Sequence, residues 1–208
     1  SHLPIAFVER IQRQFPNEWK DLLSSIETTS PISIRINPRK PYSIQSLEPV
    51  PWTRHGYYLD ERPRFTLDPY FHAGGYYVQE ASSMFLDYIL QYLKSKIKLN
   101  RVLDLCAAPG GKSTIILDHL EPSQYLVANE IIPNRNLNLR ENLTKWGYPN
   151  FLITQNKPKD FSKLENQFDL IVLDAPCSGE GMFRKDPNAI SEWAPHLAAM
   201  CADRQEDI

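Results

Sequence analysis

The sequence predicts an α/β protein in which a small α+β region precedes a Rossmann-like sheet of about four parallel strands. From residue 101 onward, apolar strand-like runs alternate with helical patterns, and repeated β-α-β units of this kind form parallel sheets. The first run leads into a turn of small residues and glycine that opens a helix, as in many ligand-binding sheets. Upstream, six of the 17 prolines fall between Pro38 and Pro69, where we expect extended segments and turns.

Composition limits the class of protein. The chain has 208 residues, of which 42% are hydrophobic and 23% charged, with a formal net charge of -2. These values are ordinary for a globular protein and exclude a disordered chain. No apolar run approaches the roughly 18 residues of a membrane span, and the N-terminus lacks a signal-peptide pattern, so no membrane partner is expected. The sequence pI near 6.2 gives no bulk attraction for nucleic acid, so any such binding requires a local basic patch.

The cysteines indicate a reducing compartment. Cys106, Cys177 and Cys201 are widely spaced and form no C-x-x-C pair. This pattern favours neither a disulfide framework nor a zinc site, so we expect free thiols, no bound metal and a cytoplasmic location.

The first region, residues 1–75, is predicted to be an α+β extension. Apolar residues recur at helical spacing from Leu3 to Ile26, and Pro16 divides this run into two short helices with Asn17 as the N-cap of the second. Residues 33–37 alternate like a half-buried strand.

The second region, residues 76–208, is predicted to hold the sheet, with helices on both of its faces. The expected helices cover residues 79–96, 112–120 and 136–146, and the expected strands cover residues 101–106, 124–130, 151–154 and 168–174. The crossover over residues 155–167 has only about a dozen residues, so we expect it to be short or irregular. A sheet of this kind usually continues through further strands, so we expect the chain to be a fragment.

The turn from Cys106 to Lys112 is the first segment that indicates chemistry. Small residues let a ligand approach the backbone, and the helix N-terminus beyond them offers free N–H groups. A phosphate-binding P-loop is excluded because Cys106 stands where its first glycine is needed, and the dinucleotide pattern G-x-G-x-x-G is absent. A nucleoside such as S-adenosylmethionine and a tight turn without a ligand both remain open.

Two strand ends carry acids that suit a nucleoside site. Glu130, at the end of the second strand, can accept hydrogen bonds from ribose hydroxyls, although it can equally be a solvated carboxylate. Asp174 ends the fourth strand at the sheet edge where open α/β sheets bind ligands, and Cys177 follows on a polar loop. A buried thiol is the alternative for Cys177. A serine hydrolase elbow at Ser178 is excluded, because Pro176 stands where glycine is required.

Two motifs together identify a family resemblance. The runs "DLCAAPGGKS" and "DAPCSGEGMFRKDP" resemble the Nol/Nop/Sun family of RNA cytosine-C5 methyltransferases, and "HAGGYYVQEASSM" and "RQEDI" also match. The resemblance runs from about Leu3 to Ile208. The "EGMFRK" continuation and the N-terminal "LPIAFVERIQ" are most similar to the bacterial branch that acts on small-subunit ribosomal RNA. The resemblance therefore implies a class I S-adenosylmethionine-dependent methyltransferase fold.

The resemblance also implies covalent catalysis. In the family, a thiolate adds to C6 of cytosine so that C5 can attack the methyl group of S-adenosylmethionine. The nucleophile belongs to a later T-C motif, which is expected beyond Ile208, so this chain by itself is expected to be inactive. Cys177 matches the other family cysteine, which assists product release. Asp174 would hydrogen-bond the cytosine edge near N3, and Lys112 could support the developing charge.

The same resemblance implies a cofactor site for S-adenosylmethionine. The positions that match it are Cys106, Ala107, Ala108, Pro109, Gly110, Gly111, Lys112, Glu130, Arg135, Asn156 and Asp174. One position departs from the family, which usually has an aspartate near the adenine where this chain has Asn156. Asp160 is a possible substitute. From its position alone, Arg135 suits surface pairing, and so does Asn142.

The resemblance implies that the extension of residues 1–75 contacts RNA, and several side chains of the chain could make such contacts. Arg184 and Lys185 follow the catalytic loop, and Arg35, Arg39 and Lys40 form a small basic cluster, although such charges are often only solvated. The run of residues 94–101 is also basic. The aromatic residues Tyr76, Tyr77 and Trp193 could stack on bases, although aromatic residues beside apolar runs are usually in the core.

The favoured function is cytosine-C5 methylation of 16S-type ribosomal RNA. Transfer RNA is the rival substrate. A non-catalytic RNA-binding or ribosome-assembly module is a rival from another class, and the absence of S-adenosylmethionine binding would identify it. An amino-group methyltransferase is a third possibility, but Cys177 stands where its motif has an aromatic residue.

Overall fold

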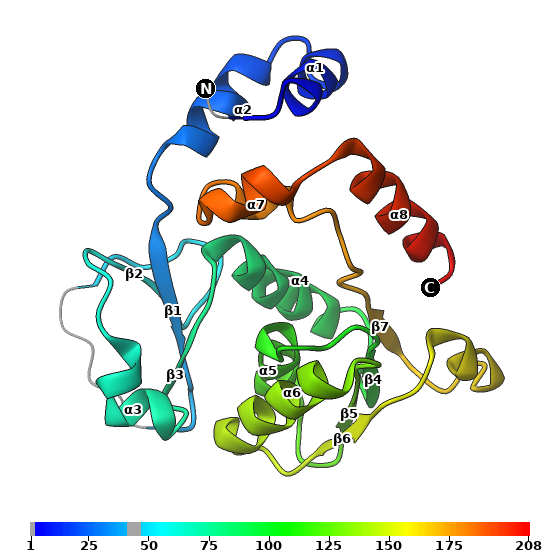
Figure 1. Ribbon diagram of the computed structural model, residues 1–208. Helices are drawn as coiled ribbons and strands as arrows, with labels where there is room; N and C mark the ends of the chain where they lie inside the picture. The colour runs from blue at the N-terminus through cyan, green and yellow to red at the C-terminus, as the bar shows by residue number, and fades with distance from the viewer. Residues whose placement is uncertain (1–2, 41–46) are drawn as a thin grey trace. The chain divides into compact units, whose positions relative to one another are not determined.

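The computed structural model describes residues 3–40 and 47–208. The chain divides into two compact units, one formed by residues 1–31 with 175–208 and the other by residues 32–174 (Figure 1). The boundary expected between residues 75 and 76 stays a prediction. Within the described residues, no helix is both long and apolar enough to cross a membrane.

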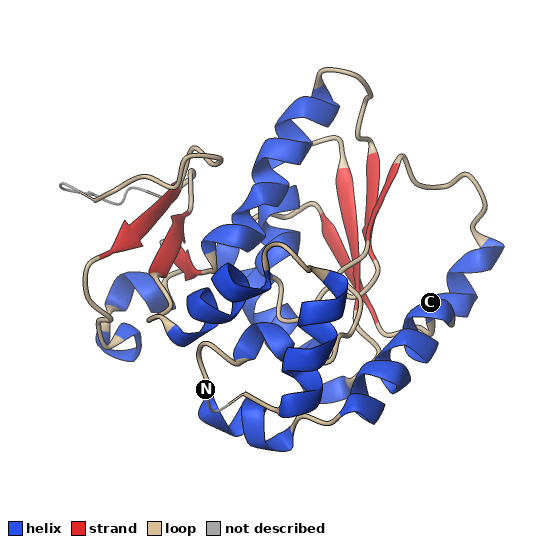
Figure 2. Ribbon diagram, turned by 90° about the horizontal axis from the view of Figure 1, so that it is seen from above, coloured by secondary structure: helices blue, strands red, loops and turns tan. Residues whose placement is uncertain are grey.

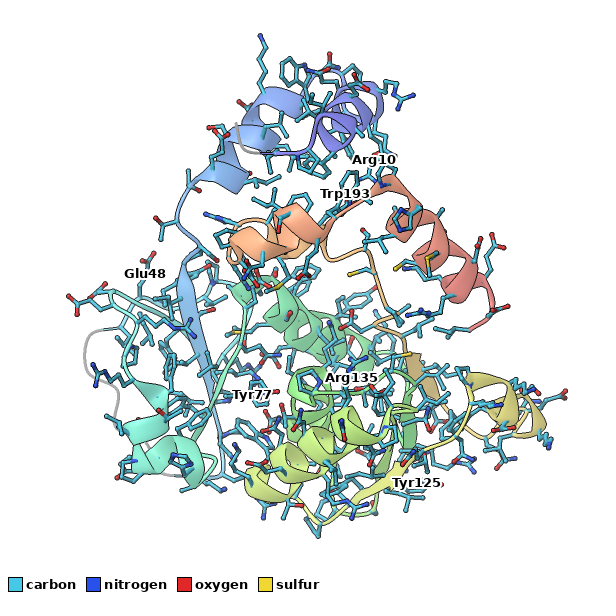
Figure 3. The ribbon with its side chains drawn as sticks, in the orientation of Figure 1. Arg10, Glu48, Tyr77, Tyr125, Arg135 and Trp193 are labelled. Atoms are coloured by element: carbon cyan, nitrogen blue, oxygen red, sulfur yellow. The ribbon has the colours of Figure 1, made fainter. Side chains whose placement is uncertain are left out.

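The unit of residues 1–31 and 175–208 is helical. It contains α1 (Ile5–Gln14), α2 (Trp19–Glu27), α7 (Pro187–Glu192) and α8 (Pro195–Glu206). Its core is aromatic, and Trp193 is buried there with its ring centroid 5.8 Å from that of Phe7. Arg10 lies 5.7 Å from the Trp193 ring (Figure 3). Trp193 is therefore a core residue rather than a base-stacking one.

The N-cap of the second helix lies one residue later than predicted. Glu18, not Asn17, is the N-cap of α2, and its side chain makes no capping hydrogen bond. The two-helix arrangement itself is confirmed, because apolar spacing specifies helices more firmly than it specifies their ends.

A small antiparallel sheet opens the unit of residues 32–174. The strands β1 (Ile32–Ile36), β2 (Gly56–Leu59) and β3 (Tyr76–Val78) lie in the order β2-β1-β3. One short 3-10 turn, η1 (Phe65–Leu67), and α3 (Pro69–His72) cover its apolar side. Tyr76 is 3% exposed in this core, so it does not stack on RNA.

The predicted parallel sheet is confirmed. Its strands β4 (Arg101–Asp104), β5 (Tyr125–Asn129), β6 (Phe151–Thr154) and β7 (Leu170–Val172) lie in the order β6-β5-β4-β7. The crossover from β6 to β7 contains only a 3-10 helix, η3 (Pro158–Lys163), as the short connection predicted.

The prediction of helices on both faces is wrong for this unit. The 3-10 turn η2 (Ala81–Met84) leads into α4 (Phe85–Lys94), and α4, α5 (Gly111–His119) and α6 (Pro133–Trp146) share one buried cluster with alternate strand residues. Figure 2 shows helices lying alongside the strands of the parallel sheet. On the opposite face, Leu152 and Ile171 of the flanking strands are each 57% exposed, whereas Leu103 and Val127 of the central strands are buried. Right-handed crossovers from β4 to β5 and from β5 to β6 run in the same direction, so they place α5 and α6 on the same face.

The strand order also fixes where a ligand can bind. The chain moves from β4 to β5 and β6 on one side, then returns to β7 on the other side of β4. This reversal opens a crevice at the carboxyl ends of β4 and β7, where doubly wound sheets bind their ligands.

A buried arginine joins the small sheet to the helices. Arg35 of β1 is 1% exposed and pairs with Asp118 of α5, and its guanidinium lies 4.6 Å from the Trp146 ring. Lys40 donates hydrogen bonds to the carbonyls of Ala73, at 2.6 Å, and Lys145, at 2.5 Å. Arg35 and Lys40 of the predicted basic cluster therefore hold the fold together, whereas Arg39 is exposed.

Candidate active site

The turn between β4 and α5 is anchored to both neighbouring strands. The Leu105 N–H donates to the Val172 carbonyl at 3.0 Å, and the Ala107 N–H donates to the Asn129 carbonyl at 2.8 Å. Ala107 and Ala108 are buried, so small side chains are needed where the turn crosses the sheet edge. The turn therefore lies over the crevice that the strand order creates.

Polar side chains from neighbouring elements hold the turn's carbonyl groups. Asn129 donates to the Leu105 carbonyl at 3.2 Å, Arg135 to that of Ala108 at 2.9 Å, and Asn142 to that of Pro109 at 2.9 Å. The guanidinium of Arg135 thus supports the turn, and the contact with the cofactor that was expected of it stays a prediction. These bonds satisfy carbonyls that the irregular backbone leaves without secondary-structure partners.

Two glycines shape the start of α5. Gly110 has φ of +111°, a conformation that side-chain-bearing residues rarely adopt. A Cβ on Gly111 would lie 3.1 Å from Gln79 Nε2 and 3.4 Å from Tyr77 Cε1. Glycine at 111 thus lets β3 approach the helix N-terminus closely.

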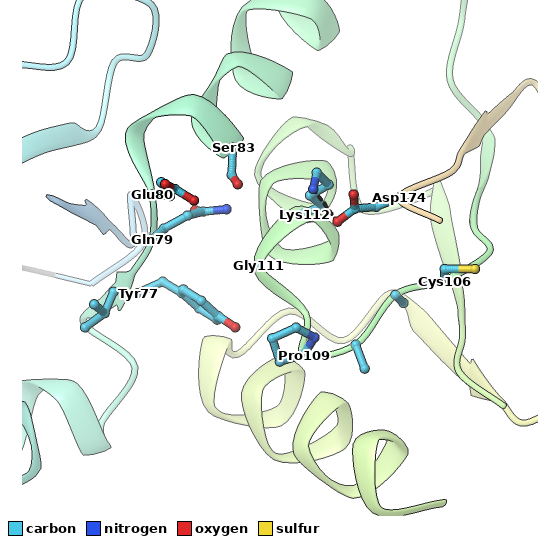
Figure 4. A pocket seen from close by; sticks show the side chains of 12 residues that line it. Tyr77, Gln79, Glu80, Ser83, Cys106, Pro109, Gly111, Lys112 and Asp174 are labelled. Carbon is cyan, nitrogen blue, oxygen red and sulfur yellow. Dashed lines mark hydrogen bonds and ion pairs between the residues drawn. The ribbon is translucent and has the colours of Figure 1, made fainter. Parts of the chain in front are cut away.

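A pocket of about 160 Å³ lies at this approach (Figure 4). It brings together most of the predicted site residues with residues from β3 and η2. Its lining comprises Tyr77, Val78, Gln79, Glu80, Ser83, Cys106, Ala107, Ala108, Pro109, Gly111, Lys112 and Asp174. The volume is below the roughly 300 Å³ of a typical ligand pocket, so it suits one end of a nucleoside cofactor.

Lys112 and Asp174 form an ion pair at the pocket. Lys112 lies in the first turn of α5, and Asp174 lies two residues after β7. Lys112 donates a hydrogen bond to Asp174 Oδ2. Their side chains are 27% and 58% exposed. The pair joins the carboxyl ends of β4 and β7, and it leaves Asp174 open to an incoming group.

Asp104 lies beneath the turn with an unusual environment. It is 1% exposed, and its Oδ2 accepts a hydrogen bond from Ser113 at 2.6 Å. Among the described residues, its Oδ1 has no hydrogen-bond partner. Burial raises the pKa of Asp104 to about 6, and the nearby carboxylates of Asp174 and Glu130 also raise it. The hydrogen bond from Ser113 and the charge of Lys112 act in the opposite direction.

The environment of Cys106 favours a neutral thiol. Burial raises the pKa of this side chain, and Glu130 and Asp104 raise it further. A raised pKa disfavours the nucleophilic thiolate. Cys106 therefore lines the pocket as a small neutral side chain.

Glu130 and Asn156 do not line this pocket. Glu130 is 3% exposed and its Oε1 accepts from the Ile132 N–H at 2.9 Å. Asn156 is exposed, and its backbone N–H donates to Asn129 Oδ1 at 2.9 Å. Asp160 accepts from the Lys157 N–H at 3.1 Å, within η3. The contacts expected of Glu130 and Asn156 with ribose and adenine stay predictions.

Cys177 lies in the other compact unit, three residues after Asp174 in the chain. Its side chain is exposed, whereas Cys201 is half-buried in α8. Arg184, in the same unit, donates to Thr28 Oγ1 at 2.8 Å and to the Thr29 carbonyl at 2.9 Å. Arg184 is therefore engaged with the N-terminal segment rather than held out for phosphate.

The pocket wall includes residues that motif reasoning did not assign to the cofactor. Gln79 and Ser83 were only part of a matching sequence run, and Tyr77 was weighed as a base-stacking residue. Burial raises the pKa of Tyr77 to about 12, so its hydroxyl stays protonated. The signal that could have found this wall is the "YYVQE" alternation after Gly74-Gly75, which places every second side chain on one strand face.

Family comparisons match both regions of the chain. Residues 3–81 match the N-terminal domain of 16S rRNA methyltransferase RsmF, and residues 91–208 match the family described as 16S rRNA methyltransferase RsmB/F. The chain belongs to the RsmB/F family. This confirms the Nol/Nop/Sun resemblance that the motifs predicted, and its bacterial branch.

Curated RsmF relatives cover the whole chain. Ribosomal RNA small subunit methyltransferase F of Pectobacterium carotovorum subsp. carotovorum is 34% identical over 226 residues, which cover 100% of this chain and 46% of the relative. The Escherichia coli O157:H7 protein of the same name is 31% identical over 225 residues, with coverage of 100% and 46%. The chain thus spans about half the length of the curated relatives it matches.

Solved structures agree with the RsmB/F assignment. A methyltransferase homolog protein from Pyrococcus horikoshii is 28% identical with a TM-score of 0.71, covering 89% of this chain and 63% of that one. NSun6 from the same organism, solved with SFG, has a TM-score of 0.75 at 17% identity, covering 98% and 78%. The second likeness supports the fold alone.

The RsmB/F fold is an S-adenosylmethionine-dependent methyltransferase fold, and the site residues fit that cofactor. The amino-acid end of the cofactor carries a carboxylate and an ammonium group. The α5 N-terminus and Lys112 offer donors for the first, and Asp174 offers an acceptor for the second. The unpartnered Oδ1 of Asp104 marks a buried acceptor beneath the same turn.

Proposed function

We propose that the protein methylates C5 of a cytosine in small-subunit ribosomal RNA, with S-adenosylmethionine as methyl donor and through a covalent cysteine adduct at C6. The observation that carries the proposal is the joining of the "DLCAAPGGKS" turn and the "DAPC" aspartate in one pocket, through the Lys112–Asp174 pair. Family membership supports a ribosomal RNA substrate, since the curated relatives are named for the small subunit. We also propose a cytoplasmic location, which the free cysteines support.

Asp174 is proposed to hold the target base. An ionised carboxylate has about four acceptor sites, so Asp174 can meet Lys112 and the cofactor's ammonium group and also accept a hydrogen bond from the cytosine edge near N3. A proton shared there offsets the charge that develops when C6 is attacked. Lys112, already paired with Asp174, orients that carboxylate and balances its charge. S-adenosylmethionine supplies the electrophilic methyl group.

Cys177 is proposed to assist product release. The family's nucleophilic thiolate forms a bond to C6, the C5 carbon gains the methyl group, and removal of the C5 proton then expels the thiolate from C6. An exposed thiol next in the chain to the Asp174 strand end can take part in that proton removal. Failure of this step leaves the protein bonded to RNA.

The reaction class can be tested with C5-deuterated cytidine in unmodified 16S ribosomal RNA. The full-length protein with S-adenosylmethionine is expected to release the deuterium and form 5-methylcytidine, measured by nuclease digestion and mass spectrometry. Transfer RNA with the same label is expected to lose none. Methylation with full retention of deuterium would contradict C5 chemistry, and release from transfer RNA alone would contradict the ribosomal substrate.

The role of Cys177 predicts a trapped complex. In the full-length protein, Cys177→Ala is expected to accumulate a covalent protein–RNA adduct, because adduct formation continues while release slows. The measurement is a shifted band on a denaturing gel. Cys201→Ala is the matched control, since Cys201 lies within α8, and it is expected to give no band. A Cys177→Ala gel like that of the wild type would contradict the role.

A further inference from the structure

We infer that Gln79 is a specificity-determining residue of the cofactor pocket, whose side-chain amide donates hydrogen bonds to the carboxylate at the amino-acid end of S-adenosylmethionine. The inference rests on the proposed function. It deepens that function by assigning one pocket wall, from the small antiparallel sheet, to one chemical group of the ligand.

Gln79 is held firmly in place by the small sheet. It follows β3 directly and is 6% exposed. Its backbone N–H donates to the Ser33 carbonyl at 3.2 Å, and its carbonyl accepts from Ser33 Oγ at 2.5 Å. Because both backbone groups are bonded to β1, the side chain leaves the strand in a fixed direction.

Arg35 settles which end of the amide faces the pocket. Arg35 Nε donates to Gln79 Oε1 at 2.8 Å, and a guanidinium has no acceptor atom, so the oxygen must be the end that meets it. The amide nitrogen is therefore the end that remains for the pocket, and Figure 4 shows it on the side of Ser83 and Gly111. Arg35 acts as a positioning residue, because it fixes this orientation without lining the pocket.

Three kinds of donor converge beside Gly111. The Gln79 Nε2 atom lies 3.1 Å from where a Gly111 Cβ would be, which places it at the N-terminus of α5. The first-turn N–H groups of a helix lack intrahelical acceptors and carry partial positive charge. Lys112 adds a full positive charge on the same turn. A group that meets amide, backbone and ammonium donors together must be an acceptor, and an anion suits it best.

The size and remaining charge of the pocket favour an amino acid over a phosphate. Asp174 and Glu80 both line the same pocket, and their carboxylates would repel a phosphate but would attract an ammonium group. A volume of about 160 Å³ holds the amino-acid end of the cofactor and not the whole nucleoside. The zwitterionic end, with its carboxylate toward Gln79 and its ammonium toward Asp174, matches both charges.

Gln79→Glu tests the donor role while keeping the Arg35 contact. One carboxylate oxygen still accepts from Arg35, and the other replaces the two N–H donors with an acceptor. In the full-length protein, calorimetry is expected to show S-adenosylhomocysteine binding weakened by about 10- to 100-fold. Binding of 5′-methylthioadenosine, which lacks the amino-acid end, is expected to change by less than about 2-fold.

Gln124→Glu is the matched control, because Gln124 is also a buried glutamine whose Oε1 accepts a hydrogen bond, from the Glu121 N–H at 2.7 Å, away from the pocket. It is expected to leave the ratio of the two affinities unchanged. Should Gln79→Glu fail to fold, Gln79→Leu removes the donors without adding charge, and the same selective loss is expected at about 5- to 20-fold.

The outcomes separate this inference from the proposed function. Equal losses for both ligands would overturn the inference, because the substitution would then damage the pocket in general. Unchanged binding of S-adenosylhomocysteine would also overturn it, while leaving the methyltransferase proposal intact. A wild-type protein that binds neither ligand would overturn the proposed function, before any substitution is compared.

Discussion

Two buried charged groups pack against α5, and their surroundings differ in one respect. At Arg35, each guanidinium nitrogen has an acceptor: Gln79, Asp118 and Thr114. Asp118 in turn accepts from Trp146 Nε1 at 2.9 Å. At Asp104, by contrast, one oxygen meets Ser113 and the other has no partner among the described residues.

The two charged groups differ in their hydrogen-bond partners and not in their burial. Arg35 and Asp104 are both 1% exposed, so burial treats them alike. A fully partnered ion pair holds elements together, and each unpartnered buried atom in a native fold calls for an explanation. The unpartnered atom lies under the cofactor turn, whereas the complete network lies behind the pocket wall.

The largest effect is expected from breaking the complete network. Arg35→Met leaves Asp118 buried without its cation, so the free energy of unfolding should fall by about 3–5 kcal/mol. Denaturant unfolding measures it. Arg39→Met is the control, because Arg39 is exposed, and its effect should stay within about 0.5 kcal/mol.

Adding Asp118→Asn to Arg35→Met tests whether the loss comes from the stranded charge. The asparagine oxygen can still accept from Trp146, while the uncompensated charge disappears. The double variant should therefore be more stable than Arg35→Met alone. If it is less stable, the network does not act as an ion pair, and the contrast with Asp104 loses its basis.

Removing the charge of Asp104 should raise the free energy of unfolding, whereas removing that of Arg35 should lower it. Its folded-state pKa of about 6 lies above the unfolded value of 3.8, so the folded state binds the proton more tightly. Stability is favoured below about pH 4 and declines as pH rises through 6. Asp104→Asn should remove this decline and raise the free energy of unfolding by about 2–3 kcal/mol at pH 8, with little change near pH 4.

The matched control for this pH series is a substitution at Asp203, which is exposed. Asp203→Asn should shift stability by less than about 0.5 kcal/mol at either pH. Destabilisation by Asp104→Asn at pH 8 would mean that the charged form is well solvated by its surroundings. Asp104 would then resemble Arg35, and partner number would not distinguish the two.

The sequence predicted the strands and the turn because both depend on local patterns. Apolar runs located β4 to β7, and the small-residue run before Lys112 located the α5 N-terminus. It did not predict that α4, α5 and α6 share one face, because periodicity carries no information on strand order. Strand order follows from crossovers that pack residues far apart in the chain.

The main error in the predicted RNA contacts concerns charged residues of the first region. Arg35 and Lys40 have the composition of a basic surface patch, and only partners at Asp118 and Lys145 show that both hold the fold together. Gln79 was overlooked for the same reason. Its donor direction depends on Arg35, 44 residues earlier in the chain, and no local spacing reveals that contact.

The smallest expected effect concerns Asn142 of α6, whose side chain supports the turn that shapes the pocket. It donates to the Pro109 carbonyl of the turn, and Asn150 donates to the carbonyls of Gln124, at 2.8 Å, and Glu121, at 3.2 Å, at the opposite end of the sheet. Each substitution to alanine should lower the free energy of unfolding by about 1 kcal/mol, because each removes side-chain bonding to backbone carbonyls.

Only Asn142→Ala should also weaken S-adenosylhomocysteine binding, by about 3- to 10-fold, since it frees a carbonyl of the turn that shapes the pocket. Calorimetry on both variants measures this difference at matched stability loss. Equal weakening by Asn150→Ala would show that affinity follows global stability. Support of the turn would then be inseparable from support of the fold, and the contrast between the two buried charges would describe stability alone.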